Sequence, residues 1–289
     1  IELLTKEYNG DLLVSDEKTK YYVRQLARIM KRTVKTLGFQ LSKGKYKPEM
    51  YEMKFEKMYD LAASEDGNTK RVELKGRIDR TDIYDDGSNK SYVKIIDYKS
   101  SSHKLDPKML EEGLSLQLAI YMKNAIETIK ERYPNKDVLP AAMLYYAIDD
   151  PFSDSRNDAE ADIRKKLIPI GAIVNDDTVM ESLDSDLAVP GTKSEAVKIT
   201  KKKDNTPDSY SNVFSSEEFD SMLIRAEEKA KELAGDILSG CIDINPYLEK
   251  NKTACDFCPI RGYCGFDIKL KGFEYRKFDE SSPEEESGE

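Results

Sequence analysis

An acid and a base stand two positions apart where an apolar stretch of the chain ends. In VKIIDYKSSS, residues 93–102, three apolar residues run into Asp97, and Lys99 follows before three serines. Side chains two apart on a strand share a face, so Asp97 and Lys99 point the same way, in line with Val93 and Ile95. The pattern fits either an exposed ion pair at a strand end or the acid and base of an active site.

A second carboxylate, Asp79, lies near the end of the preceding predicted strand, within GRIDR, residues 76–80. Two hard carboxylates can hold Mg²⁺ or Mn²⁺, with water and a substrate phosphate completing the octahedron. The metal would activate a water, and Lys99 would orient that water or stabilise the developing negative charge. A simple hairpin turning at residues 85–89 is not expected to place Asp79 opposite Asp97, so their convergence requires a bend or a strand crossing.

The amide of Gln117 lies inside an otherwise apolar stripe of a predicted helix. Gln117 and Tyr121 are four residues apart in GLSLQLAIYM and therefore share a face, which Leu110 and Leu114 extend toward the N-terminus. A buried amide without hydrogen-bond partners costs free energy, and a polar cleft would supply such partners. A glutamine at the boundary of the core that reaches water is the alternative.

Three of the four cysteines crowd together near the end of the chain. Cys255, Cys258 and Cys264 have the spacing C-x2-C-x5-C, which indicates a metal or iron–sulfur site rather than a disulfide framework. A four-iron cluster takes four cysteine ligands, so one is missing, and zinc is an alternative metal. Cys241 could be the fourth ligand, although an incidental cysteine is the simpler interpretation. The single histidine, His103, is interpreted as an ordinary surface residue.

Composition bounds the class of protein without deciding it. The 289 residues, 39% hydrophobic and 35% charged, suit one large domain or two modest ones. The formal net charge of −9 means that any contact with a nucleic-acid backbone must come from local basic patches. The sequence shows neither a long apolar run nor a signal peptide, so we expect a cytoplasmic protein without a membrane span. The missing initiator methionine suggests a piece of a longer chain.

Hydrophobic periodicity predicts helices and strands in alternation. A capping box of Ser215 and Glu218 starts the last predicted helix, and Pro107 fits the first turn of an earlier one. A polar segment, residues 149–215, is expected to hold one or two strands and a loop, KKKDNTPDSYSN, with solvated lysines. The predicted helices are 16–38, 106–132 and 216–239, and the predicted strands are 50–59, 70–80, 91–99 and 140–148.

The order of these motifs resembles the RecB-like nuclease branch of the PD-(D/E)xK superfamily. GRIDR, IIDYKSS and GLSLQLAIY carry the resemblance, followed by ACDFCPIRGYCGFD at residues 254–267, and KPEMYEMKF adds a weaker match at Glu52 and Phe55. The resemblance implies a restriction-endonuclease-like α/β fold, with a central mixed β-sheet flanked by helices and a C-terminal cysteine-rich segment. It implies a nuclease domain over residues 1–270, with an insertion at 149–215, a partial iron–sulfur staple at 241–267 and a disordered acidic tail at 271–289.

The resemblance also implies roles for single residues. The catalytic residues would be Asp79, Asp97, Lys99, Gln117 and Tyr121. The ligands of Mg²⁺ or Mn²⁺ would be Asp79, Asp97 and the carbonyl group of Tyr98. Cys255, Cys258 and Cys264 would bind a [4Fe–4S] cluster whose fourth cysteine lies upstream of the nuclease core in the family and is absent here. The chain alone is therefore expected to be a poor nuclease without a stable cluster.

The function that the resemblance implies is a metal-dependent DNA exonuclease domain. It would act on single-stranded DNA within a helicase–nuclease complex for double-strand break repair and recombination, with DNA and a second helicase–nuclease subunit as partners. Two alternatives stay open. One is a catalytically silent, iron–sulfur-stapled scaffold that guides DNA, and the other is a stand-alone Cas4-like exonuclease.

Overall fold

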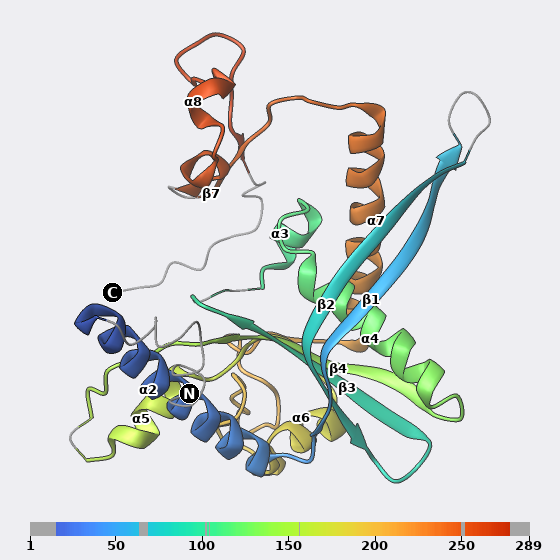
Figure 1. Cartoon of the computed structure of the whole chain (residues 1–289). Coiled ribbons are helices and arrows are strands. Elements are labelled where there is room, and N and C mark those ends of the chain that lie inside the picture. The colour runs from blue at the N-terminus through green and yellow to red at the C-terminus, as the bar shows by residue number, and fades with distance from the viewer. Residues whose placement is uncertain are drawn as a thin grey trace. The chain divides into compact units, whose positions relative to one another are not determined.

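The chain folds into two compact units, residues 1–231 and 232–289. The computed structural model describes residues 16–63, 69–101, 103, 105–155, 157–249 and 252–277. A six-stranded sheet in the order β1-β2-β3-β4-β5-β6 forms the first unit, and a three-stranded sheet in the order β8-β7-β9 belongs to the second (Figure 1). The nuclease domain predicted over residues 1–270 therefore extends across both units.

The helices and strands follow one another in the order that the periodicity predicts, with additions. In chain order they are α2 (Glu17–Lys43), β1 (Lys47–Ala63), β2 (Thr69–Asp85), β3 (Lys90–Lys99), α3 (Pro107–Glu111), α4 (Gln117–Arg132), β4 (Asp137–Ala147), α5 (Ala159–Lys166), β5 (Ile170–Val174), α6 (Asp177–Leu183), η2 (Ser185–Ala188), β6 (Val213–Phe214), α7 (Ser216–Ser239), β7 (Tyr247–Glu249), β8 (Lys252–Thr253), η3 (Ala254–Phe257), α8 (Arg261–Cys264) and β9 (Arg276–Lys277).

The large sheet is mixed, as the predicted fold class requires. β1, β2 and β3 pair antiparallel, β3 and β4 pair parallel, β4 and β5 antiparallel, and β5 and β6 parallel. The parallel pair β3–β4 needs a crossover, and α4 supplies it. β3 is buried from Ser91 to Asp97, so it is a central strand covered on both faces.

Helices cover the two faces of this sheet. α4 packs against β2, β3 and β4 through five fully buried apolar residues, Leu118, Ala119, Met122, Ala125 and Ile129. On the other face, Leu37, Gln40 and Leu41 of α2 meet Lys94 and Ile96 of β3 around a small cavity. α4 therefore lies on the face of Asp97 and Lys99, and α2 lies on the face of Lys94 and Ile96 (Figure 1).

The helix predicted over residues 106–132 is two helices. Pro107 stands in the first turn of α3, as predicted, but the helix ends at Glu111. Gly113 has a φ of +80°, a backbone conformation that glycine adopts without steric cost, and α4 starts only at Gln117. The face that Leu110 and Leu114 were expected to extend is therefore interrupted.

The polar segment from residue 149 to 215 is part of the sheet. It supplies β5 and β6, in agreement with the one or two strands expected there. Its lysine tract is not solvated throughout, because Lys201 is only 1% exposed and its Nζ lies 2.8 Å from a carboxylate oxygen of Asp177. The segment also contains α5 and α6, two helices of eight and seven residues that the sequence pattern did not predict.

Capping explains where the two long helices begin. The side chain of Asp16 accepts a hydrogen bond from the backbone N–H of Thr19 at the start of α2, which runs five residues beyond the predicted end at residue 38. The capping box of α7 is confirmed: the N–H of Glu218 donates to Ser215 Oγ at 3.2 Å, and the N–H of Ser215 donates to Glu218 Oε2 at 2.8 Å.

The second unit is small and built from short elements. β7 pairs with β8 antiparallel and with β9 parallel. Phe266 packs against Phe273 and Tyr275, with ring centroids 5.4 Å and 5.1 Å apart. β9, Arg276–Lys277, lies inside the predicted acidic tail, residues 271–289, of which residues 278–289 lie outside the described part of the chain.

Among the helices that the structure describes, none combines the length and the apolar character needed to cross a membrane.

Candidate active site

The candidate site lies where β2 and β3 stop pairing. Their ladder runs from Asp85 opposite Ser91 to Arg80 opposite Ile96. One further step in the same register places Asp79 opposite Asp97. The expected bend or strand crossing is therefore wrong, because the simple hairpin register already aligns the two aspartates.

Asp79 also lies in the interior of its strand rather than near an end. β2 is 17 residues long and pairs with β1 along most of its length, whereas its pairing with β3 ends at Arg80. The β1–β2 ribbon thus continues beyond the sheet while β3 ends at Lys99 (Figure 1). The two aspartates stand at this divergence.

A hydrogen bond joins the two strands just beyond the ladder. The backbone N–H of Tyr98 donates to Asp79 Oδ2 at 2.8 Å. The β2–β3 ladder ends at Ile96, so the N–H of Tyr98 has no backbone partner on β2. The Asp79 carboxylate takes the place of that partner. Asp79 is held beside the Asp97–Lys99 segment, although the two aspartates are 18 positions apart in the sequence.

Lys99, Asp97 and Gln117 form a connected polar cluster on the α4 face of the sheet. Lys99 Nζ lies 2.6 Å from Asp97 Oδ2 and donates to Gln117 Oε1 at 2.7 Å. Gln117 Nε2 donates to Asp97 Oδ1 at 3.2 Å and to the hydroxyl of Tyr121 at 3.0 Å. The amide of the half-buried Gln117 therefore has hydrogen-bond partners within the protein at both its oxygen and its nitrogen.

Aromatic packing holds Tyr121 in place. Its ring meets the ring of Phe55 edge to face, with centroids 5.7 Å apart. A Cβ at Gly76 would lie 2.4 Å from the Phe55 ring and 3.1 Å from the Tyr121 ring, so β2 can pass under both rings only with glycine at that position. The glycine of GRIDR thus has a packing role that supports the orientation of Gln117.

Asp97 is a buried acid whose pKa is shifted. It is only 3% exposed, and burial raises the pKa of its carboxyl, with the charge of Asp79 adding to the rise and Lys99 opposing it. Asp97 Oδ2 makes no aligned hydrogen bond, even though Lys99 Nζ stands 2.6 Å away. Two carboxylates at adjacent register positions, one of them buried against Lys99, are an oxygen donor set that suits Mg²⁺ or Mn²⁺.

Glu52 is not brought into this cluster. It has a φ of +51°, and its carboxylate, which is 60% exposed, pairs with Arg77 Nε at 2.8 Å. Within the described residues, no three side chains of aspartate, glutamate, histidine or cysteine lie close enough together to hold a metal ion. Any metal at Asp79 and Asp97 would need further ligands from the backbone, water or substrate.

Tyr145 is a neighbour of the site that the sequence reasoning missed. It stands beside Asp97 in the parallel β3–β4 register, and Lys99 Nζ lies 5.5 Å from its ring centroid. Burial raises the pKa of its hydroxyl, and the charge of Asp97 adds to the rise. No local sequence signal pointed to it, because the proximity comes from the pairing of β3 with β4. His103 is exposed, as expected, but its ring centroid lies 5.6 Å from that of Tyr145.

A buried ion network supports the site from the opposite face of the sheet. Arg80 donates through Nε and Nη2 to the two oxygens of Asp82 at 2.6 Å and 2.7 Å, and Lys94 Nζ lies 2.9 Å from Asp82 Oδ2. Asp82 and Lys94 are directly opposite each other across the two strands. Arg80 Nη1 also approaches the hydroxyl of Tyr98 at 3.4 Å. The network therefore links β2 to β3 beside both aspartates.

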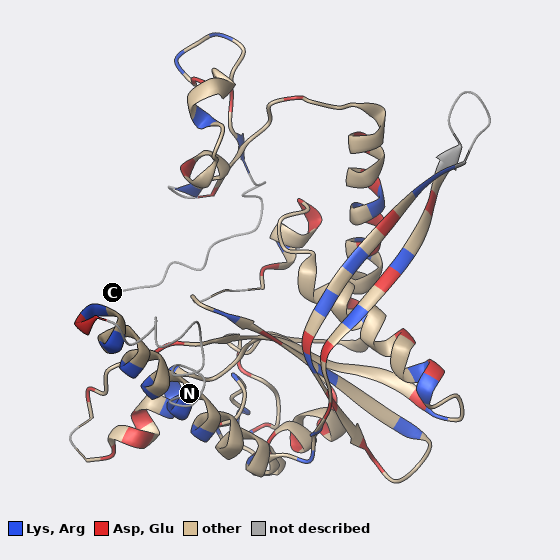
Figure 2. Cartoon of the chain, viewed as in Figure 1, with Lys and Arg blue, Asp and Glu red and all other residues tan. Residues whose placement is uncertain are grey.

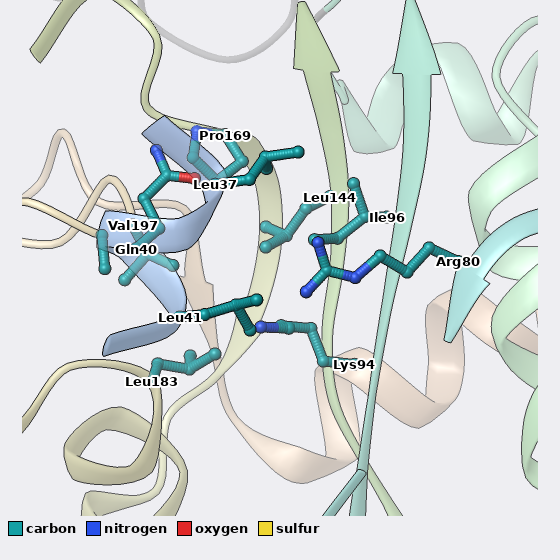
Figure 3. Close-up of a pocket in the computed structure, with 11 residues that line it drawn as sticks. Leu37, Gln40, Leu41, Arg80, Lys94, Ile96, Leu144, Pro169, Leu183 and Val197 are labelled. Carbon is teal, nitrogen blue, oxygen red and sulfur yellow. The ribbon is translucent and has the colours of Figure 1, made fainter. Parts of the chain in front are cut away.

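This network is enclosed by apolar side chains. The exposed fractions of Arg80, Asp82 and Lys94 are 3%, 0% and 9%. Figure 3 shows Arg80 and Lys94 reaching toward Leu37, Leu41 and Leu183 around a cavity of about 20 Å³, roughly the space of one water. Burial lowers the pKa of Lys94, and the charge of Asp82 opposes that shift.

The cysteines of the second unit do not form a metal-binding group among the described residues, although the backbone N–H of Cys258 donates to the carbonyl of Cys255 at 3.5 Å. Cys255, Cys258 and Cys264 are half-buried free thiols, and Cys241 is exposed. Cys255 lies in η3, Cys258 follows directly after it, and Cys264 is the last residue of α8. In the part of the chain that the structure describes, the thiols are not gathered into a metal-binding group, so this arrangement does not by itself fit a cluster.

The fold and the cluster together define a class of protein. An acid on one strand, an acid-x-lysine pair on the next and a glutamine from the following helix, on a mixed α/β sheet, are features of a metal-dependent nuclease. A family model described as the PD-(D/E)XK nuclease superfamily matches residues 2–265, and the chain belongs to that superfamily. The family resemblance inferred from the motifs is confirmed.

Curated relatives within this superfamily share one name. The B subunit of the ATP-dependent helicase/deoxyribonuclease of Lachnoclostridium phytofermentans is 35% identical over 286 residues, which cover 97% of this chain and 24% of the relative. The proteins of the same name from Clostridioides difficile and Moorella thermoacetica are 32% and 31% identical, each over 96% of this chain and 24% of their own length. The chain thus spans about a quarter of the length of the curated relatives that it matches.

Replacing Asp82 with asparagine is expected to destabilise the first unit by roughly 3–5 kcal/mol, because Arg80 and Lys94 would remain buried without a full counter-charge. The free energy of unfolding in urea is the measurement. Asp60→Asn is the matched control, since Asp60 pairs with Arg71 where both side chains are about two-thirds exposed, and such a pair contributes about 0–1 kcal/mol. Equal losses in the two variants would contradict a structural role for the network.

Asp97→Asn is expected to stabilise the metal-free chain at neutral pH. Because the pKa of Asp97 is raised in the folded state, the folded chain binds more protons than the unfolded chain between the two pKa values. The free energy of unfolding therefore falls as the pH rises between the two pKa values. Above both values the wild-type protein is destabilised by the whole cost of burying the Asp97 charge. Urea unfolding should show the gain at about pH 7 and a smaller gain toward about pH 4. A less stable asparagine variant at neutral pH would mean that the ion pair with Lys99 outweighs burial.

Proposed function

We propose that this chain is the nuclease domain of a helicase–nuclease subunit and hydrolyses phosphodiester bonds of single-stranded DNA as a metal-dependent exonuclease. The observation that carries the proposal is the cluster of Asp97, Lys99 and Gln117, with Asp79 one register step beyond the β2–β3 ladder. Membership of the nuclease superfamily supports it, as does the word deoxyribonuclease in the names of the relatives.

The metal ligands in this proposal are Asp79, Asp97 and the carbonyl group of Tyr98. In an antiparallel pair, the N–H and C=O of one residue point toward the same neighbouring strand. The N–H of Tyr98 reaches Asp79 on β2, so its C=O points toward the same strand, which supports this group as a third oxygen ligand. When bound, Mg²⁺ or Mn²⁺ supplies an activated water and neutralises charge on the phosphate.

In this proposal Lys99 stabilises the developing charge on the phosphate, and Gln117 and Tyr121 position Lys99. Lys99 is held between Asp97 and Gln117, which directs its ammonium group to the position where phosphate charge increases during hydrolysis. Gln117 contacts both the acid and the base of the pair, so it fixes their separation. Tyr121 accepts a hydrogen bond from the Gln117 amide and thereby sets which end of the amide faces Lys99.

The partners in this proposal are DNA and a second, AddA-like helicase–nuclease subunit. The relatives are named as subunits of an ATP-dependent helicase/deoxyribonuclease, and they are about four times as long as this chain. ATP-driven strand separation is therefore assigned to sequence outside this chain, and strand cleavage to the site between β2 and β3. Double-strand break repair in the cytoplasm is the setting that these partners suggest.

Asp97→Ala and Lys99→Ala are each expected to lower kcat for Mg²⁺-dependent cleavage of a single-stranded oligonucleotide at least about 100-fold, because each removes a charged group from the reacting centre. Cleavage should be measured in the complete helicase–nuclease complex. Lys90→Ala is the matched control, because Lys90 begins the same strand at its far end and is exposed.

The same assay separates the alternatives. Cleavage that survives both substitutions would refute the assignment of the site. If the wild-type complex binds the oligonucleotide equally well with and without Mg²⁺ and does not cut it, the domain is a silent guide for DNA. A chain that cuts at the full rate without its partner subunit would be a stand-alone exonuclease.

The cysteine-rich segment is proposed to bind part of a [4Fe–4S] cluster in the intact protein, on the strength of its C-x2-C-x5-C spacing alone. Cys255, Cys258 and Cys264 supply three thiolates, and a four-iron cluster takes four. This chain, prepared without oxygen, is therefore expected to hold well under one cluster, measured as iron and sulfide per chain. Stoichiometric iron that disappears in Cys241→Ser would instead identify Cys241 as the fourth ligand.

A further inference from the structure

α2 concentrates positive charge in an acidic chain. The helix contains eight lysines and arginines and a single acidic residue, Glu17, whereas the whole chain has a net charge of −9. Figure 2 shows Lys and Arg positions in blue recurring along α2, and the face that they form is called the basic surface. Basic residues clustered along one helix are the electrostatic pattern of a nucleic-acid contact.

The second half of this basic surface borders a groove between α2 and α5. The groove has a volume of about 300 Å³ and is lined by five basic residues and one acid, with Thr36 and Ile163 between them. The basic residues are Arg28, Lys31, Arg32, Lys35 and Arg164, and the acid is Glu160. The groove is therefore a concave surface with an excess of positive charge.

Ion pairs neutralise only part of this charge. Asp150 pairs with Arg28 and Arg32, and Glu160 lies 2.8 Å from Lys35. Lys31 has no ion-pair partner in the described part of the chain.

Arg164 is likewise without a paired carboxylate in that part of the chain. Its guanidinium lies 4.3 Å from the centroid of the Phe39 ring, and its buried Nε has no hydrogen-bond partner. A guanidinium stacked on an aromatic ring keeps its position while its outer N–H groups stay available to an anion. Lys31 and Arg164 are thus the lining cations without a paired carboxylate in the described part of the chain, and Asp150 offsets only one of the two charges of Arg28 and Arg32.

The groove and the candidate active site both lie near the C-terminal ends of β3 and β4. Lys99 ends β3 opposite Ala147 at the end of the parallel strand β4, and the N–H of Ile148 donates to the carbonyl of Lys99 at 2.7 Å. Asp150 follows two residues later, and Arg32 of α2 bonds both to Asp150 and to the carbonyl of Pro151, the latter at 3.2 Å. The groove is on the α2 face of the sheet and the site is on the α4 face. A DNA strand that passes over the C-terminal ends of β3 and β4 can therefore contact both.

We infer that the groove between α2 and α5 binds the phosphate backbone of the single strand whose phosphodiester bonds the site cleaves. The inference rests on the proposed nuclease function. Arginine binds phosphate oxygens through a planar fork and lysine as a point charge, and neither contact depends on base sequence. A sequence-independent contact suits an exonuclease, which must accept each nucleotide in turn.

The test is binding of a fluorescein-labelled, single-stranded oligothymidine to the full chain in EDTA, where cleavage cannot occur. Lys31→Gln with Arg164→Gln is expected to raise Kd about tenfold and to lower the salt slope of log K by roughly 0.7 for each phosphate that is no longer neutralised. Lys31→Gln alone should give about half the change in slope, and it leaves the stacking of Arg164 on Phe39 intact. In the complete complex with Mg²⁺, KM should rise while kcat at saturating oligonucleotide stays unchanged.

Lys202→Gln with Lys203→Gln is the matched control, because it removes the same charge from two exposed lysines of another surface. Equal Kd and salt slope in the groove and control variants would overturn the inference, even if Asp97→Ala abolishes cleavage. If groove variants keep oligonucleotide binding but lose binding of a polyglutamate peptide, the groove belongs to an acidic protein segment and the inference is also wrong. If Asp97→Ala leaves cleavage intact, the proposed function fails whatever the groove binds.

Discussion

The site depends on one constraint, which is that β2 and β3 stop pairing one residue before two aspartates would face each other. Like charges directly opposite on neighbouring strands are destabilising, and the register of this hairpin places Asp79 against Asp97. Ending the ladder at Arg80 lets the Asp79 carboxylate accept the N–H of Tyr98 instead of facing another carboxylate directly. The repulsion that ends the strand pairing is also what makes the position attractive to a cation.

The alternation of side chains along β3 places two different polar clusters on the two faces of the sheet. Asp97 and Lys99 meet Gln117 on one face, while Lys94 and Tyr98 meet the Arg80–Asp82 pair on the other. Both sets are largely buried, so each charge must find its partner within the protein. The buried pairs behind the strand hold the hairpin together where the front is weakened by two close carboxylates. The ion pairs on one face therefore offset the repulsion between the carboxylates on the other.

Sequence reasoning recovered what depends on period and on local chemistry. The period-two pattern identified β3 and the shared face of Asp97 and Lys99, and the capping box identified the start of α7. The register that aligns Asp79 with Asp97 was available too, because both lie equally far from Ser88 in the turn, but it was missed by treating Asp79 as a strand end. The break at Gly113 was harder, since a glycine within a helical pattern is often tolerated.

Other features could not be read from the sequence because they arise from tertiary contacts. Nothing local marks Lys201 as buried or Tyr145 as a neighbour of Asp97, since each depends on a partner far away in the chain. β6 has only two residues and exists because β5 offers it an edge. Patterns of three or four residues carry too little information to compete with such pairing.

The net charge of the chain says little about whether it can approach a phosphate. Screening limits the reach of an exposed charge to about 10 Å at moderate ionic strength, so a phosphate near the end of β3 responds to Lys99, Asp79 and Asp97 rather than to the distant acids. Of these three charges two are negative, so without a metal this position has a net negative charge and repels a phosphate. A divalent cation reverses that sign. Under the proposed function, metal and DNA must then each strengthen the binding of the other, because the free energy of coupling between two ligands is reciprocal. Asp97, whose carboxylate is buried beside Asp79 and would bind the metal directly, is where that coupling would originate.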